Sequence, residues 1–89
     1  MYEYSYSDEF LNKLVKLKKR DPNQYKLVKK KVDQICNSPN HSYKYLKHHL
    51  KKLMRVHIGH FVLVFQIDHK TKTVSFEDYE HHDKIYLNS

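Results

Sequence analysis

Hydrophobic side chains recur along this chain with two different periods, and the change of period divides the chain into two parts. From residue 8 to residue 35, the large apolar residues are three or four positions apart, which is typical of amphipathic helices. Between residues 53 and 79, and most clearly from Phe61 to Ile67, they fall on alternate positions, as in strands with one face on a core. The pattern predicts helices first and a sheet afterwards.

Two helices joined by a short link are predicted near the N-terminus. Phe10, Leu14 and Leu17 form the apolar stripe of the first helix, and Asp8 is its candidate N-cap. The link Asp21–Gln24 favours a new helix, because aspartate can cap it and proline suits its first turn. The stripe of the second helix consists of Tyr25, Val28, Val32 and Ile35. Residues 37–40 end this helix, and we expect an antiparallel helical hairpin that packs on a sheet.

The C-terminal half is predicted to be an antiparallel meander. Its strands are expected at Leu53–Ile58, Phe61–Ile67 and Thr73–Tyr79. Gly59, the one glycine of the chain, lies between the first two strands, where a tight reversal favours positive φ. The polar residues 68–72 suit the second hairpin loop. Met1–Ser7 alternates tyrosine with polar residues and predicts a short strand that joins the same sheet.

These elements define an α+β fold in the order β-α-α-β-β-β. With 89 residues, the chain has room for a single domain, 1–89, with one modest core. We expect an antiparallel sheet with the helical hairpin on one face and, on the other face, Arg55, His57, Val62 and Val64. The segment His41–Lys52 is predicted to be an irregular basic connection, with a short turn of helix as an option.

The net charge of +7 is distributed unevenly. Through Leu53 there are thirteen Lys or Arg against five Asp or Glu, a net of +8, and from Met54 onward four against five, a net of −1. A basic half beside a nearly neutral one fits a polyanionic partner, nucleic acid first. The alternative is ordinary solubilising lysine on exposed helix faces.

The single cysteine, Cys36, cannot form a disulfide within the chain, which suits a reducing cytoplasm. We expect it to act as a small buried apolar residue. The sequence has neither a signal-peptide pattern nor an 18-residue apolar run, so no membrane partner is expected.

The tail after the last predicted strand holds a candidate acid–base cluster. His81 and His82 are adjacent, and Tyr86 follows four residues later. Histidine titrates near neutrality and can therefore give or take a proton at working pH. In a chain with eight histidines, however, adjacent pairs arise without function, and His48-His49 is a second such pair.

A candidate phosphate-binding group precedes the meander. Arg55 and His57 are two positions apart in a strand and share one face, and Lys51 and Lys52 lie just upstream. Such cations could bind phosphate oxygens, although a solvent-facing polar side of the sheet is an equally simple interpretation.

Several potential zinc ligands lie in this half of the chain. They are His57, His60, His81, His82 and Asp83. Their spacing matches no diagnostic pattern, and no metal or other cofactor is predicted.

The order of elements and three local motifs resemble RelE/ParE-type toxins. The run Leu53–Asp68 is similar to their "(Y)RVRIGxYRVxYEID" core, and His81–Tyr86 is similar to their closing "HRxxIY" motif. Leu46–Leu50 resembles their "LKGxL" segment. The resemblance spans nearly the whole chain and implies a RelE-like fold and the toxin of a type II toxin–antitoxin pair. Its implied partner is a small, acidic, helical antitoxin.

In the RelE branch, the resemblance implies a ribosome-dependent endoribonuclease (an mRNA interferase) that inhibits translation in the cytoplasm. Attack of a 2′-hydroxyl on the adjacent phosphate would use His81, His82 and Tyr86 for proton transfer and orientation. The RNA phosphate would be held by Lys51, Lys52, Arg55 and His57, with no cofactor. The partners would then be mRNA and the ribosome.

One position departs from the active ribonucleases. Val62 stands where they carry the arginine of "YR". The alternative is therefore a ParE-like or catalytically weak relative that acts by binding a protein target such as DNA gyrase. A basic nucleic-acid-binding module without a toxin role is a third interpretation.

Overall fold

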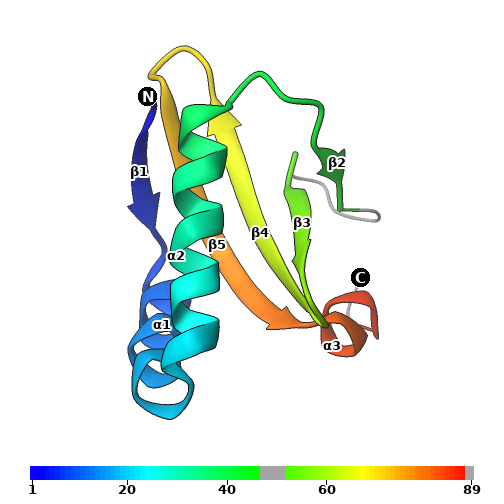
Figure 1. Ribbon diagram of the computed structural model, residues 1–89. Helices are drawn as coiled ribbons and strands as arrows, with labels where there is room; N and C mark the ends of the chain where they lie inside the picture. Colours follow the sequence, from blue (N-terminus) through cyan, green and yellow to red (C-terminus); the bar gives the residue numbers. More distant parts are fainter. Residues whose placement is uncertain (47–51, 88–89) are drawn as a thin grey trace.

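The computed structural model describes residues 1–46 and 52–87, with side chains up to Ile85 at the C-terminal end. Two helices lie side by side across one face of a five-stranded sheet, and a third, short helix follows the last strand (Figure 1). The elements in chain order are β1 (Glu3–Tyr6), α1 (Asp8–Arg20), α2 (Pro22–Asn37), β2 (Lys44–Tyr45), β3 (Met54–Ile58), β4 (Phe61–Asp68), β5 (Thr73–His81) and α3 (His82–Leu87). The predicted α+β fold and its main order are confirmed.

The helical hairpin forms where the sequence predicted it, with one different cap. Ser7, not Asp8, is the N-cap of α1, because its hydroxyl accepts the Phe10 N–H at 3.0 Å while Asp8 already belongs to the helix. Asp21 caps α2 as predicted and accepts the Gln24 N–H at 3.2 Å. The two caps fix the start of each helix and therefore the phase of its apolar stripe.

The strand order in the sheet is β1-β5-β4-β3-β2. The neighbours from β5 to β2 run antiparallel, as expected, but β1 lies parallel to β5 with Tyr4 opposite Val74. The prediction of a wholly antiparallel sheet is therefore wrong at this edge. The helical hairpin carries the chain back across the sheet between β1 and the later strands, and such a crossover permits parallel pairing.

Two further differences bear on the site. Part of the segment predicted to be irregular forms β2, which extends the sheet beside β3 with Lys44 opposite Arg55. The last strand continues two residues beyond Tyr79, so His81 belongs to β5 and His82 begins α3. A positive φ of 63° at Gly59 allows the tight turn between β3 and β4, as predicted.

The main core lies between the helical hairpin and the sheet. Phe10, Phe65 and Phe76 are fully buried there, and Cys36 joins them as the buried small residue that the sequence predicted. Burying an aromatic side chain of this size contributes about 2–3 kcal/mol to the free energy of unfolding. This core holds the sheet, and with it the ends of β3 and β5, against α1 and α2.

A second, smaller core covers part of the opposite face. Val62 and Val64 were expected on that face, and both are buried there under Leu46, Leu53 and Ile85. The face was assigned correctly, because the register places Val62 opposite His57 and Val64 opposite Arg55. The sequence missed that the segment before β3 and the helix after β5 fold back over these valines.

Candidate functional site

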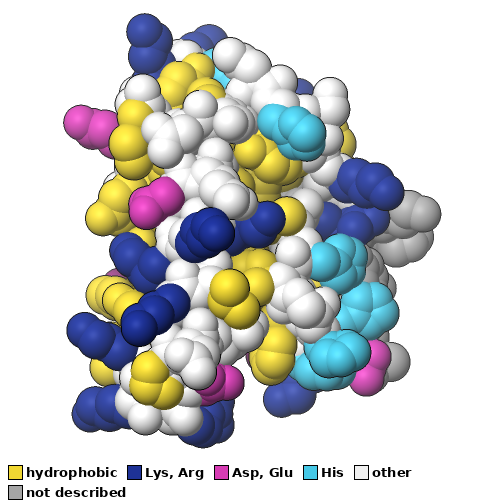
Figure 2. Space-filling model, in the orientation of Figure 1, with side chains coloured by type: hydrophobic (Ala, Val, Ile, Leu, Met, Phe, Trp, Pro, Cys, Tyr) yellow, Lys and Arg dark blue, Asp and Glu magenta, His cyan; other side chains and the backbone are white. Residues whose placement is uncertain are grey.

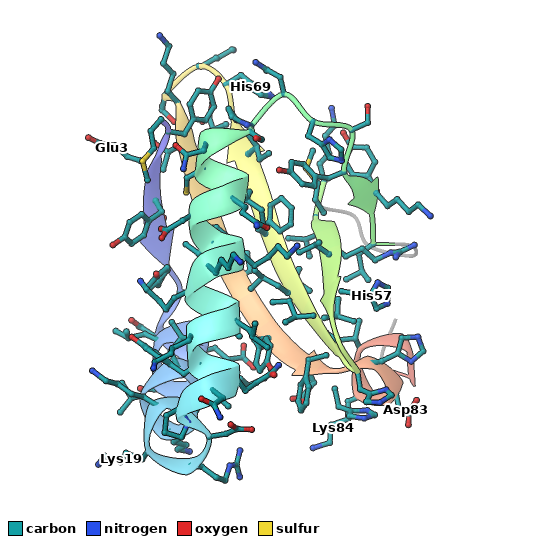
Figure 3. The ribbon with its side chains drawn as sticks, viewed as in Figure 1. Glu3, Lys19, His57, His69, Asp83 and Lys84 are labelled. Carbon is teal, nitrogen blue, oxygen red and sulfur yellow. The ribbon has the colours of Figure 1, made fainter. Side chains whose placement is uncertain are left out.

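Four histidines meet at one end of the sheet. His57 ends the polar side of β3, His60 lies in the turn after it, and His81 and His82 stand at the junction of β5 and α3. Histidine side chains gather on one side of the face shown in Figure 2, and His57 and Asp83 are labelled near the same end in Figure 3. Antiparallel pairing brings them together, since Phe61 on β4 lies opposite His81 on β5.

The histidines face one another in two pairs. The ring centroids of His57 and His82 are 5.6 Å apart, and those of His60 and His81 are 6.3 Å apart with nearly parallel planes. The His82 N–H donates to the His60 carbonyl oxygen at 2.8 Å, which ties the start of α3 to the β3–β4 turn. Each of the two adjacent tail histidines thus lies beside another histidine: His82 beside His57 of β3, and His81 beside His60 of the β3–β4 turn.

Asp83 orients both tail imidazoles. Its backbone N–H donates to Nδ1 of His81 at 3.2 Å, so a neutral His81 carries its proton on Nε2. Its carboxylate oxygen Oδ1 lies 3.4 Å from Nδ1 of His82. Both imidazoles remain roughly half exposed, so a bound molecule can reach their outer nitrogens. The sequence indicated Asp83 only as a potential zinc ligand, and its position in the first turn of α3 brings it into contact with both imidazoles instead.

His57 is held in its neutral form more firmly than an ordinary histidine. Partial burial lowers the pKa of its imidazole, and the positive charges of Arg55, His82 and Lys44 lower it further. At neutral pH, His57 can donate a hydrogen bond or accept a proton but adds little positive charge. A neutral imidazole suits proton transfer, whereas the predicted charge pairing with phosphate needs the protonated form.

The cations of the site lie on β3 and β2. Arg55 is half-buried on the face that also carries His57, and Lys44 stands opposite Arg55 in the register. Lys52 is exposed just before β3, and Lys51 lies outside the described residues. Lys44 could not be predicted as part of this group, because a two-residue strand leaves no periodic signal that could pair it with Arg55.

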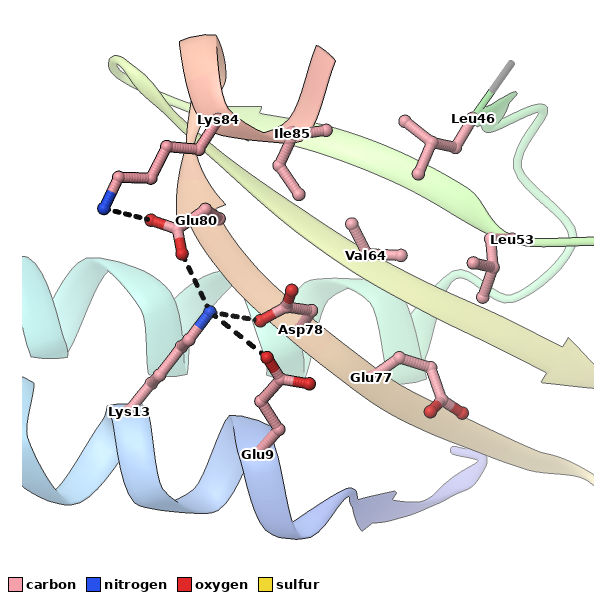
Figure 4. Close-up of a pocket in the computed structure, with 10 residues that line it drawn as sticks. All are labelled: Glu9, Lys13, Leu46, Leu53, Val64, Glu77, Asp78, Glu80, Lys84 and Ile85. Carbon is pink, nitrogen blue, oxygen red and sulfur yellow. Dashed lines mark hydrogen bonds and ion pairs between the residues drawn. The ribbon is translucent and has the colours of Figure 1, made fainter. Parts of the chain in front are cut away.

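Carboxylates occupy the other half of this face. Glu77, Asp78 and Glu80 of β5 line a cavity of about 340 Å³, together with apolar side chains of the second core (Figure 4). The half-buried Lys13 of α1 reaches into this group and contacts Asp78 and Glu80. The face is thus divided into a cationic side on β2 and β3 and an anionic side on β5, with Val62 and Val64 between them.

Two predicted site residues are placed only in part. Tyr86 lies in α3, one turn after His82, but its side chain is outside the described part of the chain. Among the described residues, no three histidine, cysteine or acidic side chains are grouped so that they could hold a metal ion, and this includes the potential zinc ligands named from the sequence. In the same described ranges, no helix has the length and apolar character of a membrane span.

The comparisons with known proteins agree with this fold. Residues 4–86 match the family model described as "ParE toxin of type II toxin-antitoxin system, parDE". The chain is 46% identical over 87 residues to a protein of Methanocaldococcus jannaschii named "Putative toxin RelE4", covering 97% of this chain and 92% of that protein. It is equally similar to an uncharacterized protein of Methanosarcina mazei, with 97% and 100% covered.

Solved structures show the same fold at lower sequence identity. The isolated E. coli RelE toxin matches with a TM-score of 0.76 and 16% identity, covering 99% of this chain and 94% of that one. The toxin–antitoxin complex RelBE2 from Mycobacterium tuberculosis contains a chain that matches with a TM-score of 0.75 and 21% identity, with 90% and 96% covered. The fold and these relatives define a toxin of a type II toxin–antitoxin system. The chain belongs to the RelE/ParE family of such toxins.

Proposed function

We propose that this toxin is an endoribonuclease that cleaves mRNA in the cytoplasm, in a ribosome-dependent manner, and so inhibits translation. The observation that carries the proposal is the approach of His82 to His57, which lies on the same face of β3 as Arg55. Two imidazoles that repel each other when both are charged favour a state in which one is protonated and one is neutral. A general acid and a general base are needed together for cleavage of a phosphodiester.

In the proposed reaction, the neutral imidazole takes the proton of a 2′-hydroxyl, and O2′ attacks the adjacent phosphorus. The P–O5′ bond breaks, and the protonated imidazole gives its proton to the leaving 5′-oxygen. The products are a 2′,3′-cyclic phosphate and a 5′-hydroxyl. His82 and His57 suit these two steps by their proximity, while His81 and Tyr86 assist proton transfer and orientation.

The path of the RNA follows from the distribution of charge on this face. The cations on this face lie on or next to β2 and β3: Lys44, Lys52 and Arg55. We assign the RNA phosphates to these three residues and to Lys51. The carboxylates of β5 repel a polyanion and so keep the strand off the other half of the face. No cofactor is required for this chemistry.

The proposed protein partner is a cognate antitoxin, small, helical and acidic, which would neutralise this basic toxin by covering its site. The +7 charge of the chain supports an acidic partner, and relatives of the same fold have been solved as toxin–antitoxin complexes. Co-expression with the short reading frame beside the toxin gene should yield a complex that co-purifies. If neither neighbouring frame encodes a binding protein, this part of the proposal fails.

Expression of the toxin without its partner tests the activity in cells. We expect growth arrest with a fall in protein synthesis, and relief by His82→Ala or Tyr86→Phe. The control is His69→Ala, because His69 lies in the β4–β5 turn at the other end of the sheet, where it pairs with Tyr2. Arrest that persists in both site variants would remove the assignment of the site.

A second candidate function is binding of a protein target such as DNA gyrase. Two observations favour it: the family model is that of ParE toxins, and Val62 is fully buried where active ribonucleases carry an arginine. This alternative predicts inhibition of gyrase supercoiling in vitro by purified toxin, and no RNA cleavage. The ribonuclease proposal predicts the opposite result in both assays.

A further inference from the structure

Lys13 of α1 forms ion pairs with two acidic side chains of the last strand, β5. Nζ of Lys13 lies 2.7 Å from Oδ1 of Asp78 and 3.0 Å from Oε2 of Glu80, and 3.7 Å from Glu9 on its own helix (Figure 4). The lysine and the two β5 carboxylates are each about 30% exposed. A partly desolvated ammonium between carboxylates of one strand is a stronger restraint than an isolated surface pair.

Glu80 connects this contact to the histidines. Its Oε2 accepts the hydrogen bond from Lys13, and its Oε1 accepts the backbone N–H of His81 at 3.0 Å. The next residue, His82, is held from the other side, since its N–H donates to the carbonyl oxygen of His60. The chain turns from strand to helix at this point, so the two contacts set the direction in which both imidazoles leave the sheet.

We propose that Lys13 and Glu80 are positioning residues that fix the β5–α3 junction and thereby the imidazoles of His81 and His82. This inference rests on the proposed function for its catalytic consequence, but its structural content stands without that function. Neither residue faces the cationic side where RNA is placed, and neither is a proton donor or acceptor in the reaction. Their effect passes through the backbone of the junction.

The charge states of Lys13 and Glu80 suit this positioning role. Burial alone would lower the pKa of the Lys13 ammonium, but its bonds to Asp78 and Glu80 raise it above the ordinary value. Burial would likewise raise the pKa of the Glu80 carboxyl, and the bonds from Lys13 and from the His81 N–H lower it instead. The two groups therefore both stay charged at neutral pH.

The test uses four variants of the full chain. Lys13→Met and Glu80→Gln remove one partner each, the double variant removes both, and Lys19→Met is the control. Lys19 lies on the same helix and carries the same charge, but it is exposed and lines neither of the cavities that Glu80 lines. Circular dichroism establishes that each variant is folded, and Lys13→Gln, which also removes the charge, replaces Lys13→Met if that variant is not.

The first readout does not depend on activity. Amide hydrogen exchange at His81 and His82 should be about tenfold faster in Lys13→Met and Glu80→Gln, the loss expected for one hydrogen bond, and unchanged in Lys19→Met. The imidazole NMR signals of both histidines should move in the same two variants. Exchange rates and signals equal to those of the wild type in both single variants would overturn the inference.

The second readout separates positioning from binding. On programmed ribosomes, or on free RNA if the wild type cleaves it, the maximal rate should fall about 10- to 100-fold in Lys13→Met and Glu80→Gln, while the half-saturating RNA concentration changes little. The double variant should be no slower than the slower single one, because the pair acts as one unit. Unchanged rates in these variants, beside an inactive His82→Ala, would overturn the catalytic part of the inference alone. An active His82→Ala would instead overturn the proposed site.

Discussion

His57 and His82 face each other across the end of the sheet with 5.6 Å between their ring centroids. His57 lies in β3 and His82 in the first turn of α3. The backbone N–H of His82 donates to the carbonyl oxygen of His60 in the β3–β4 turn, and this hydrogen bond fixes the position of His82. Partial burial lowers the pKa of His57, and the positive charges of Arg55, His82 and Lys44 lower it further. A neutral imidazole beside a second histidine is an arrangement that can supply a general base and a general acid.

The lowered pKa of His57 predicts how RNA binding responds to pH. His57 is neutral at pH 7 and gains its charge only below its lowered pKa, so its contribution to phosphate binding grows as the pH falls from 7 to 5. We expect affinity for RNA to rise over this interval, and to rise less in His57→Gln. Fluorescence anisotropy with a labelled RNA measures both.

The same relationship can be observed directly by NMR titration. Replacing His82 with alanine removes one of the positive charges that lower the pKa of His57, so the titration of His57 should move to higher pH. His69→Ala should leave it in place, since His69 lies in the distant β4–β5 turn. A His57 titration that does not move in His82→Ala would contradict the close pairing of the two rings.

Arg55 is predicted to bind a phosphate rather than a base. Arg55→Gln should therefore weaken binding to RNA of any sequence and reduce the slope of log affinity against log salt concentration by about one. Lys26→Gln, an exposed change on the outer face of α2, is the matched control for lost charge. An equal change of slope in both variants would mean that general charge, and not this site, attracts RNA.

The small core around Val62 should carry measurable stability. Val62→Thr keeps the shape but places a hydroxyl among apolar side chains, which should lower the free energy of unfolding by about 1–2 kcal/mol. Val15→Thr, at a half-exposed position of α1, should change it by less than about 0.5 kcal/mol. Urea unfolding followed by circular dichroism measures both, and equal values would show that Val62 is not enclosed as described.

The contact between Lys13 and Glu80 predicts an acid-sensitive component of stability. The folded-state pKa of Glu80 is below its ordinary value, so the stabilisation is complete above the unfolded pKa, near 4.5, and is lost as the pH falls through the folded value. Unfolding free energies between pH 6 and pH 3 should therefore fall more steeply in the wild type than in Glu80→Gln. Parallel curves would contradict the pairing.

The sequence predicted what depends on neighbouring residues and missed what depends on distant ones. The stripe Phe10–Leu17, the link at Asp21 and the alternation Phe61–Ile67 each carry their own periodic signal, so the helices and the central strands were found. The parallel partner of β1 and the short strand β2 have no local signal, because pairing is decided by the assembled sheet. The N-cap was misplaced by one residue, since Ser7 and Asp8 are both good caps.

For the candidate site, the sequence likewise predicted which residues share a face but not which residues lie close together. His57 and Arg55 were assigned to one face correctly, because strand alternation decides the face. The distance from His57 to His82 depends on the pairing of β3 with β4, of β4 with β5, and on the turn into α3, none of which the sequence spells out. Glu80 and Lys13 lie on separate elements and were not recognised as a pair for that reason.

The chemistry of the product tests most directly whether this pair of histidines cleaves RNA. Purified toxin should cut mRNA on programmed ribosomes and leave a 2′,3′-cyclic phosphate and a 5′-hydroxyl, as end-specific labelling and mass spectrometry can establish. His82→Ala should lower the single-turnover rate by about 100-fold or more, while His69→Ala should keep the wild-type rate. Cleavage by His82→Ala at the wild-type rate, or intact mRNA with the wild-type toxin, would contradict the account.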